Sequence, residues 1–354
     1  SPMSHTLTKP SDTWSPLYFL ASVGAGGLSV TFFMYLMFWV PHPNAPVPVF
    51  EDIAAALATG NTALTIGIAI AMIGIAIFGA MNIAMLVWNL RRVGAFTASE
   101  RGKAMINSNA GTQMLTMPLA LAMSINAGFI LGLVFVPGLW SIVEYLFPMA
   151  LLAFLAVGVL AFSQLGGFIK RIVSSGGFDC TKNNSFGQMM PAFALAMVGV
   201  GLAAPAAMST VALVSGLSIV LSSFFLISAV IITVITLMLG LRAIMEHGIA
   251  AEQAPTLMMV IPIVTILGIL MLRQAHGLHV HFDSHGGPGA DLVLLTRLLS
   301  VQALFAMLGV AVLSATGYVG RFLSGETVSP GNYSLICPGV ALSVLLHFWI
   351  NKGL

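Results

Sequence analysis

Long apolar stretches without a charged side chain make up most of the sequence. Such windows lie between Asp12 and Glu51, Asp52 and Arg91, Lys103 and Glu144, and Lys182 and Arg242. Because a helix needs about 20 consecutive apolar residues to cross a bilayer, each window holds at least one membrane-spanning helix. The last window is long enough for two, and Ala204-Pro205 with Ser209-Thr210 supplies a turn in its middle.

The same pattern, followed along the whole chain, predicts nine transmembrane helices. We place them at residues 15–40, 62–90, 113–137, 141–169, 187–207, 210–241, 254–275, 293–321 and 332–350. The prediction is an all-α membrane protein with a cytoplasmic N-terminal segment, residues 1–13, and one transmembrane domain, residues 14–354. We interpret Ser1-Pro2-Met3-Ser4 as a cloning remnant before a native Met3, and we expect no cleavable signal peptide.

Composition excludes a water-soluble domain. Charged residues are 7% of the chain and hydrophobic residues 58%, whereas soluble domains carry about 25% charged residues. The formal net charge of +2 gives no reason to expect nucleic acid as a partner. The two cysteines, Cys180 and Cys337, fall in a predicted loop and a predicted helix, so no disulfide framework is implied.

Lysine and arginine residues gather on one side of the predicted membrane. That side holds Lys9, Arg91, Arg92, Arg101, Lys103, Lys170, Arg171, Lys182, Arg242 and Arg321. The opposite side has loop 41–60, with Glu51 and Asp52, and loop 276–292, with four histidines and two aspartates. Because positively charged loops stay in the cytoplasm, we expect a multi-pass protein of the cell (inner) membrane with a cytoplasmic N-terminus.

A proline stands early in each odd-numbered span. These prolines are Pro16, Pro118, Pro191, Pro262 and Pro338, and the last four recur at intervals of 73, 71 and 76 residues. Each interval is the length of two spans with their loops, so the pattern indicates a repeated helical hairpin. The alternative is that membrane helices are simply rich in proline, and Pro148 in the fourth span departs from the pattern.

The repeat has a physical interpretation. Proline removes a backbone hydrogen bond, and irregular backbone within a membrane is tolerated where it is buried in protein or lines a cavity. Five kinks at equivalent depth therefore predict five inner helices around one axis. The odd spans are also rich in glycine and serine, whereas even spans such as Phe224 to Leu241 are rich in Val, Ile and Leu, as lipid-facing helices are.

The hairpin order and the proline positions resemble one known family. The resemblance is strongest at Asn184-Ser185-Phe186-Gly187, which leads into Met190-Pro191-Ala192, and at Leu335-Ile336-Cys337-Pro338-Gly339. In these features the chain resembles the SLAC/TehA family of plant guard-cell slow anion channels, bacterial TehA tellurite-resistance proteins, and yeast-type malate and sulfite exporters. The resemblance implies ten helices in five hairpins with quasi-five-fold symmetry around a central pore, of which this chain shows nine, and a homotrimer.

In that family a phenylalanine of the ninth helix, immediately before the proline, plugs the pore. Here the corresponding residue is Cys337, which puts gating by phenylalanine at this position in doubt. Phe193 and Phe129 are the alternative candidate gates, together with Met117 and Met190 beside the prolines.

The function that follows is passive movement of small inorganic or dicarboxylate anions through a narrow and mostly uncharged pore. Ions must bind such a pore well enough to enter and weakly enough to leave. The candidate pore-lining polar residues are Ser22, Ser124, Asn126, Thr265 and Ser343. The sequence leaves chloride, nitrate, sulfite, malate and tellurite all open.

Four further features carry ionisable groups, and each has two interpretations. His279 and His281, with Asp283 and His285 nearby, are suited to a metal on extended backbone, or they belong to a polar external loop, which we prefer. Arg297 either attracts anions to an outer vestibule or extends towards the membrane surface. Ionisable groups in spans are functional candidates by default, and Glu144 and His347 are candidates that are equally explained by an interfacial position.

Two other classes of function compete with an anion channel. A membrane subunit of an oxidoreductase would bind haem through pairs of histidines, but only His347 lies well within a predicted span. We therefore expect no enzyme activity, no cofactor and no metal. A proton-coupled carrier for organic anions or oxyanions is the second alternative, and it would need a protonatable relay in mid-membrane.

Overall fold

The computed structural model describes residues 13–176, 178–179, 186–283, 286–325, 327 and 329–353. Over these residues the chain is helical and contains no β-strand. Most of the predicted N-terminal segment, Cys180, Lys182 and His285 lie outside the described residues.

Nine helices of the described part are long and apolar enough to cross a membrane. They cover Pro16–Trp39, Thr62–Ala98, Asn109–Phe135, Leu139–Ser175, Gly187–Met208, Ala212–His247, Leu257–Phe282, Gly289–Ala315 and Asn332–Lys352. The turn predicted at Ser209-Thr210 separates α7 (Met190–Met208) from α8 (Ala212–His247). The predicted all-α membrane fold is confirmed.

The five odd-numbered spans form a closed ring of inner helices. Their α-helical parts are α1 (Phe19–Trp39), α5 (Thr116–Phe135), α7, α9 (Val260–Phe282) and α11 (Ile336–Phe348). Around the ring, α1 contacts α5, α5 contacts α7, α7 contacts α9, α9 contacts α11, and α11 contacts α1. Five inner helices therefore surround one axis, as the proline repeat predicted.

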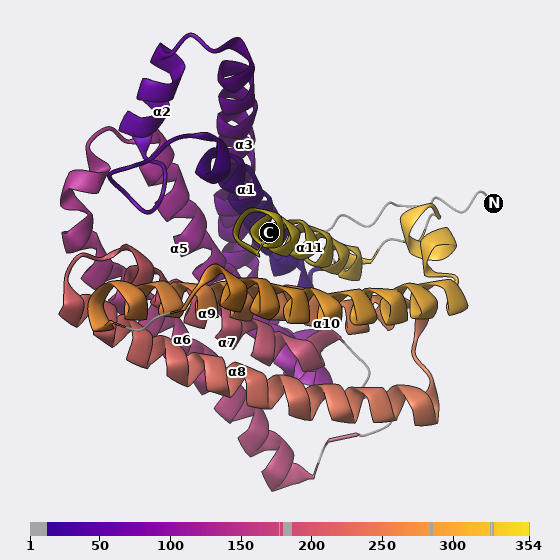
Figure 1. The fold of residues 1–354 in the computed structure, drawn as a ribbon. Helices are drawn as coiled ribbons and strands as arrows, with labels where there is room; N and C mark the ends of the chain where they lie inside the picture. Colours follow the sequence, from indigo (N-terminus) through magenta and orange to yellow (C-terminus); the bar gives the residue numbers. More distant parts are fainter. Residues whose placement is uncertain are drawn as a thin grey trace.

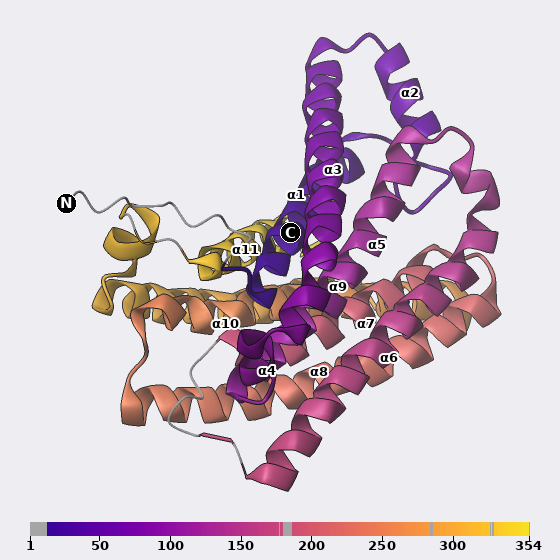
Figure 2. The same ribbon diagram turned by 180° about the vertical axis from the view of Figure 1, so that it is seen from behind.

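The even-numbered spans pack outside this ring. They are α3 (Thr62–Ala98), α6 (Val143–Ser175), α8 and α10 (Pro288–Ala315). Each lies against two neighbouring inner helices: α3 on α1 and α5, α6 on α5 and α7, α8 on α7 and α9, and α10 on α9 and α11. Both views of the ribbon show α3 and α8 on opposite sides of the ring of inner helices (Figures 1 and 2).

Burial separates the two sets of helices. The most apolar window of each outer span is 11% to 33% buried, whereas the corresponding windows of the inner spans are 39% to 94% buried. The exposed side chains of the outer helices are large and apolar, for example Val220, Phe224 and Met238 of α8. In a bilayer these faces contact lipid, which costs nothing for hydrocarbon side chains.

A short 3-10 helix leads into each inner α-helix. These segments are η2 (Pro16–Tyr18), η3 (Asn109–Leu115), η6 (Phe186–Met189), η7 (Ala251–Met259) and η9 (Pro330–Leu335). They contact one another in the same circular order as the helices that follow them. The five inner helices therefore all begin at one end of the bundle and run in the same direction.

The repeated prolines lie at these junctions. Pro16 opens η2, Pro191 is the second residue of α7, and Pro118, Pro262 and Pro338 are the third residues of α5, α9 and α11. In the first turn of an α-helix the backbone N–H has no intrahelical partner, so proline fits there at little cost. In four of the inner spans the 3-10 segment thus lies on the N-terminal side of the proline, whereas in the first span Pro16 begins it.

One helix was not predicted, and several helix ends differ from the predicted spans. The loop at 41–60 contains a further helix, α2 (Phe50–Ala58), and α3 runs on to Ala98, so that Arg91 and Arg92 lie within it. The helix α9 continues to Phe282, and the expected polar loop from residue 276 is therefore wrong over its first half. Hydropathy missed this extension because the last turns of α9 carry polar histidines that no longer resemble a span.

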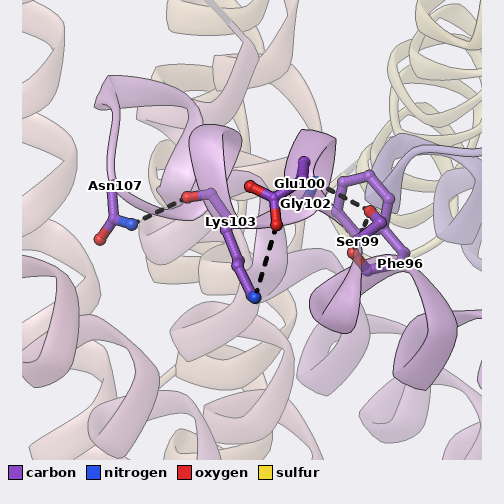
Figure 3. Close-up of polar contacts among 6 residues, drawn as sticks. All are labelled: Phe96, Ser99, Glu100, Gly102, Lys103 and Asn107. Atoms are coloured by element: carbon purple, nitrogen blue, oxygen red, sulfur yellow. Dashed lines mark hydrogen bonds and ion pairs between the residues drawn. The ribbon is translucent and has the colours of Figure 1, made fainter.

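A tight connection joins α3 to the short helix α4 (Glu100–Ile106), shown in Figure 3. Ser99 caps α4, because its hydroxyl oxygen accepts a hydrogen bond from the Gly102 N–H at 3.0 Å and its O–H donates to the Phe96 carbonyl at 2.6 Å. Lys103 pairs with Glu100 at 3.7 Å on the exposed side of α4. The capping hydroxyl satisfies a backbone donor that the start of a helix leaves unpaired.

Candidate transport cavity

A cavity of about 280 Å³ lies inside the ring of inner helices. All five inner helices contribute to its wall, and α6 and the loop before α2 complete it. Its lining is mostly apolar and is rich in methionine and phenylalanine. These residues are Met34, Met37, Met123, Met197, Met208, Phe33, Phe129, Phe147, Phe154, Phe193 and Phe348.

The cavity extends from the first turns of the inner helices to their C-terminal ends. Near the first turns it is lined by Val23, Phe193, Pro262 and Cys337. At the other end it is lined by residues that include His276 and Lys352, both exposed. The cavity thus reaches the surface at the end of the bundle opposite the 3-10 segments.

The described residues of the 3-10 segments do not line the cavity, so the cavity stops short of the end where the inner helices begin. Leu20, Leu119, Met190 and Met259 are fully buried there, and they belong to one hydrophobic cluster with Phe193 and Cys337. We call the first four residues the inner plug. Because the interior of a protein is close-packed, we interpret the inner plug as the region that closes the cavity at this end.

Arg273 and Lys352 are the positively charged side chains among the described lining residues, His276 adds an imidazole, and no aspartate or glutamate is among them. The other polar lining residues are Asn126, Thr265 and Cys337. An anion in the cavity therefore meets basic groups at the open end and neutral groups elsewhere.

Arg273 is the basic residue set deepest in the wall. It lies on α9, three residues before His276, and is half-buried. Its Nη1 donates to the carbonyl of Val200 on α7 at 2.6 Å, and no ion pair joins it to a carboxylate among the described residues. A guanidinium has five N–H donors, so the bond to Val200 fixes the group and leaves most of its donors for other partners.

The two neutral polar groups of the wall differ in how far they are already bonded. Thr265 donates its hydroxyl proton to the Ala341 carbonyl at 2.9 Å and accepts from Nε2 of Gln302, a buried residue of α10. Asn126 donates weakly to the sulfur of Met197 at 3.7 Å. Thr265 thus has no proton left for an ion, whereas the amide of Asn126 keeps bonding capacity.

The structure brings together part of the predicted site. All three candidate gates, Cys337, Phe193 and Phe129, line the cavity, as do Asn126 and Thr265. Cys337 is buried, and the ring of Phe129 stacks on Phe147 at a centroid distance of 6.2 Å. Of the five repeated prolines, Pro262 lines the cavity.

Four other predicted site residues lie away from the cavity lining. The hydroxyl of Ser22 donates to the carbonyl of Asn82 on α3 at 2.8 Å, and the hydroxyl of Ser124 donates to Ala120 of its own helix at 2.7 Å. Ser343 is half-buried on α11, and Arg297 is exposed on the outer helix α10. Serine in a membrane helix readily bonds a neighbouring carbonyl, which draws such hydroxyls away from the cavity.

Two ionisable candidates have structural partners. Glu144, in the first turn of α6, accepts hydrogen bonds from the Ser209 hydroxyl at 2.7 Å and from the Thr210 N–H at 2.7 Å, so it fixes the turn between α7 and α8. His347 lies edge-on to Tyr35, with ring centroids 5.1 Å apart. Neither residue lines the cavity.

Three of the four histidines of the expected loop, His276, His279 and His281, lie on the last turns of α9, and His285 lies outside the described residues. A nitrogen of the His281 ring lies 2.8 Å from the Ser209 carbonyl, and His276 lines the cavity. Among the described residues, no three His, Cys, Asp or Glu side chains gather as a group that could hold a metal ion.

Sequence reasoning missed Arg273, although a signal was available. Arg273 stands within the predicted span 254–275, and an ionisable residue inside a span is a functional candidate by default. The arginine that the sequence favoured, Arg297, is exposed on the outer helix α10. No family model, curated protein or solved structure matches this chain.

Proposed function

We propose that this protein moves small anions across a cell (inner) membrane through the cavity inside its ring of inner helices, as a passive channel or exporter. One observation carries the proposal: the cavity lies on the axis of five membrane-spanning helices, and its charged lining residues are basic. A multi-pass membrane protein with a cavity inside a ring of spanning helices is typical of transport.

Electrostatics favour an anion over a cation in this cavity. Moving any ion into an apolar space is costly unless opposite charge compensates it. Arg273 and Lys352 supply positive charge, and no carboxylate among the described lining residues attracts a cation. The inner α-helices also begin at the closed end, where the positive ends of their dipoles favour an anion.

The resemblance to slow anion channels and TehA proteins supports the same proposal. It adds a gate near the start of the ninth span and a trimer with one pore per subunit. In this chain Phe193 and Cys337 stand at the closed end of the cavity, beside the inner plug. We propose that opening moves these side chains apart. A trimer is tested by mass measurement in detergent, and a monomer would contradict it.

A proton-coupled carrier is the second candidate, and His276 favours it. His276 lines the open end of the cavity, and histidine changes its charge near neutral pH more readily than any other side chain. A carrier of this kind would acidify the lumen of liposomes as the anion enters, whereas a passive channel would not.

Flux into proteoliposomes tests the proposal. The purified protein is reconstituted, and uptake of chloride, nitrate, sulfite, malate and tellurite is compared with that of protein-free liposomes. We expect currents that change when the anion is replaced and that persist when potassium is exchanged for a large organic cation. Currents that follow the cation and ignore the anion would overturn the assignment.

A further inference from the structure

We infer that the cavity is a binding site for small organic acids with one carboxylate and an apolar body, and that Arg273 binds the carboxylate. The inference rests on the proposed function in taking the cavity as the path of the substrate, and it narrows the class of anion. It follows from the uneven distribution of charge along the cavity, from the chemistry of its walls and from its size.

Positive charge is confined to one end of the cavity. Arg273 lies past the middle of α9, and Lys352 follows the C-terminal end of α11. The deeper part is lined by Met123, Phe193 and other apolar residues, with Asn126, Thr265 and Cys337 as the polar ones. A ligand with one charged group therefore fits with that group outward, whereas a second carboxylate would be buried without a cation, at high cost.

The guanidinium of Arg273 is positioned for a carboxylate. Its bond to the Val200 carbonyl at 2.6 Å fixes the group against α7. The planar fork of arginine donates two parallel hydrogen bonds to a carboxylate, a geometry that a spherical halide cannot use. Because no ion pair involves Arg273 within the described part of the chain, a bound carboxylate would be its first negatively charged partner.

The deeper wall suits hydrocarbon of variable shape. Five methionines line the cavity, and their unbranched side chains adapt to irregular ligands. A hydrated inorganic ion would leave this apolar surface wet, whereas an alkyl or phenyl group would cover it. The volume of about 280 Å³ is at the lower end of small-molecule sites, so the ligand is a small acid.

A homologous series of ligands measures the apolar contact. Binding of propanoate, butanoate, pentanoate and hexanoate to the full chain in nanodiscs is followed by isothermal titration calorimetry. We expect the dissociation constant to fall about fourfold for each added methylene group, since each one buries apolar surface. Succinate, with the carbon chain of butanoate and a second carboxylate, should bind at least tenfold more weakly than butanoate.

Three variants separate the charged contact from the apolar contact. Arg273→Gln should weaken butanoate binding more than tenfold, and the matched control Arg297→Gln, which changes an exposed arginine outside the cavity lining, should leave it unchanged. Ile269→Thr changes a lining residue one turn deeper on α9 and should reduce the gain per methylene while butanoate still depends on Arg273. Each variant is checked for a single peak in size-exclusion chromatography and for unchanged thermal stability.

The outcomes distinguish this inference from the proposed function. Equal affinity along the acid series, or butanoate binding that survives Arg273→Gln, would overturn the inference, and uptake of nitrate or chloride would then still support anion transport. Affinity that rises with chain length and needs Arg273, without passage of any anion through the membrane, would support the binding site and contradict transport.

Discussion

The buried bond between Thr265 and Gln302 ties an outer helix to the wall of the cavity. Thr265 of α9 donates to Ala341 of α11 at 2.9 Å, and Gln302 of α10 donates both to Thr265 and to the Ile261 carbonyl, the latter at 3.0 Å. Thr265→Val keeps the shape of the side chain and removes the hydroxyl. We predict that this single change loosens the contact of three helices.

The size of the effect follows from counting bonds. Thr265→Val removes two hydrogen bonds, and bonds between membrane helices are worth about 0.6 kcal/mol on average and about 1.7 kcal/mol at most. The free energy of unfolding should therefore fall by about 1–2 kcal/mol. Gln302→Leu should cost less, because the Oε1 atom of Gln302 is buried without a partner among the described residues and its removal relieves that penalty.

The test is a double-mutant cycle in mixed micelles. Unfolding free energies are measured for Thr265→Val, for Gln302→Leu and for the double variant, with Thr233→Val as the matched control. The hydroxyl of Thr233 donates to the Ala229 carbonyl of its own helix at 2.6 Å, so replacing Thr233 by Val should change stability by less than about 0.5 kcal/mol. Strictly additive effects, or a cost of Gln302→Leu above that of Thr265→Val, would refute this reasoning.

Three further predictions concern the gate, the α3–α4 connection and the outer turn. Cys337→Phe should lower anion flux, because the ring fills the closed end of the cavity. In a Cys180→Ser background, a small methanethiosulfonate should block flux by reacting with Cys337. Flux that survives both treatments would place the constriction elsewhere. Gly102→Ala should lower the free energy of thermal unfolding by more than about 2 kcal/mol, because the added Cβ would lie 1.7 Å from the Phe96 carbonyl oxygen. The control Lys103→Gln, which removes an exposed ion pair, should lower it by less than about 0.5 kcal/mol. Equal costs of the two variants would contradict the capping geometry. Glu144→Gln should cost about 1–2 kcal/mol by weakening charged hydrogen bonds to Ser209 and Thr210, and wild-type stability of Glu144→Ala would disprove it.

The fold was predictable because hydropathy and backbone hydrogen bonding determine which segments cross a membrane. A bilayer allows few charges in a span, so charge-free windows located the helices, and the prolines located the first turns of the inner ones. The same rule placed the end of α9 too early. A helix continues as long as its backbone hydrogen bonds do, and in α9 these bonds extend past the polar histidines to Phe282.

The cavity wall was less predictable, because the face of a helix is set by packing. Ser22 and Asn126 are both polar residues of inner helices, yet Ser22 bonds α3 and Asn126 lines the cavity. A period of 3.6 residues separates the two faces only when the polar pattern is strong, and these helices are apolar on every side. Cys337 was predicted at the pore through the resemblance, which aligns it with a phenylalanine immediately before the proline, and it lines the cavity.

The closure of the cavity at one end has a consequence for how the membrane voltage acts. A cavity that opens to water carries less of the membrane voltage than packed protein does, so we expect most of the drop across the inner plug of Leu20, Leu119, Met190 and Met259. With the open end facing outward, as the distribution of Lys and Arg predicts, and with the anion transport proposed above, a cell that is negative inside would drive anions outward whenever the plug opens. The work is about 2.3 kcal/mol per charge for each 100 mV, so under this proposal a resting cell would favour export without any pump, and depolarisation would slow it.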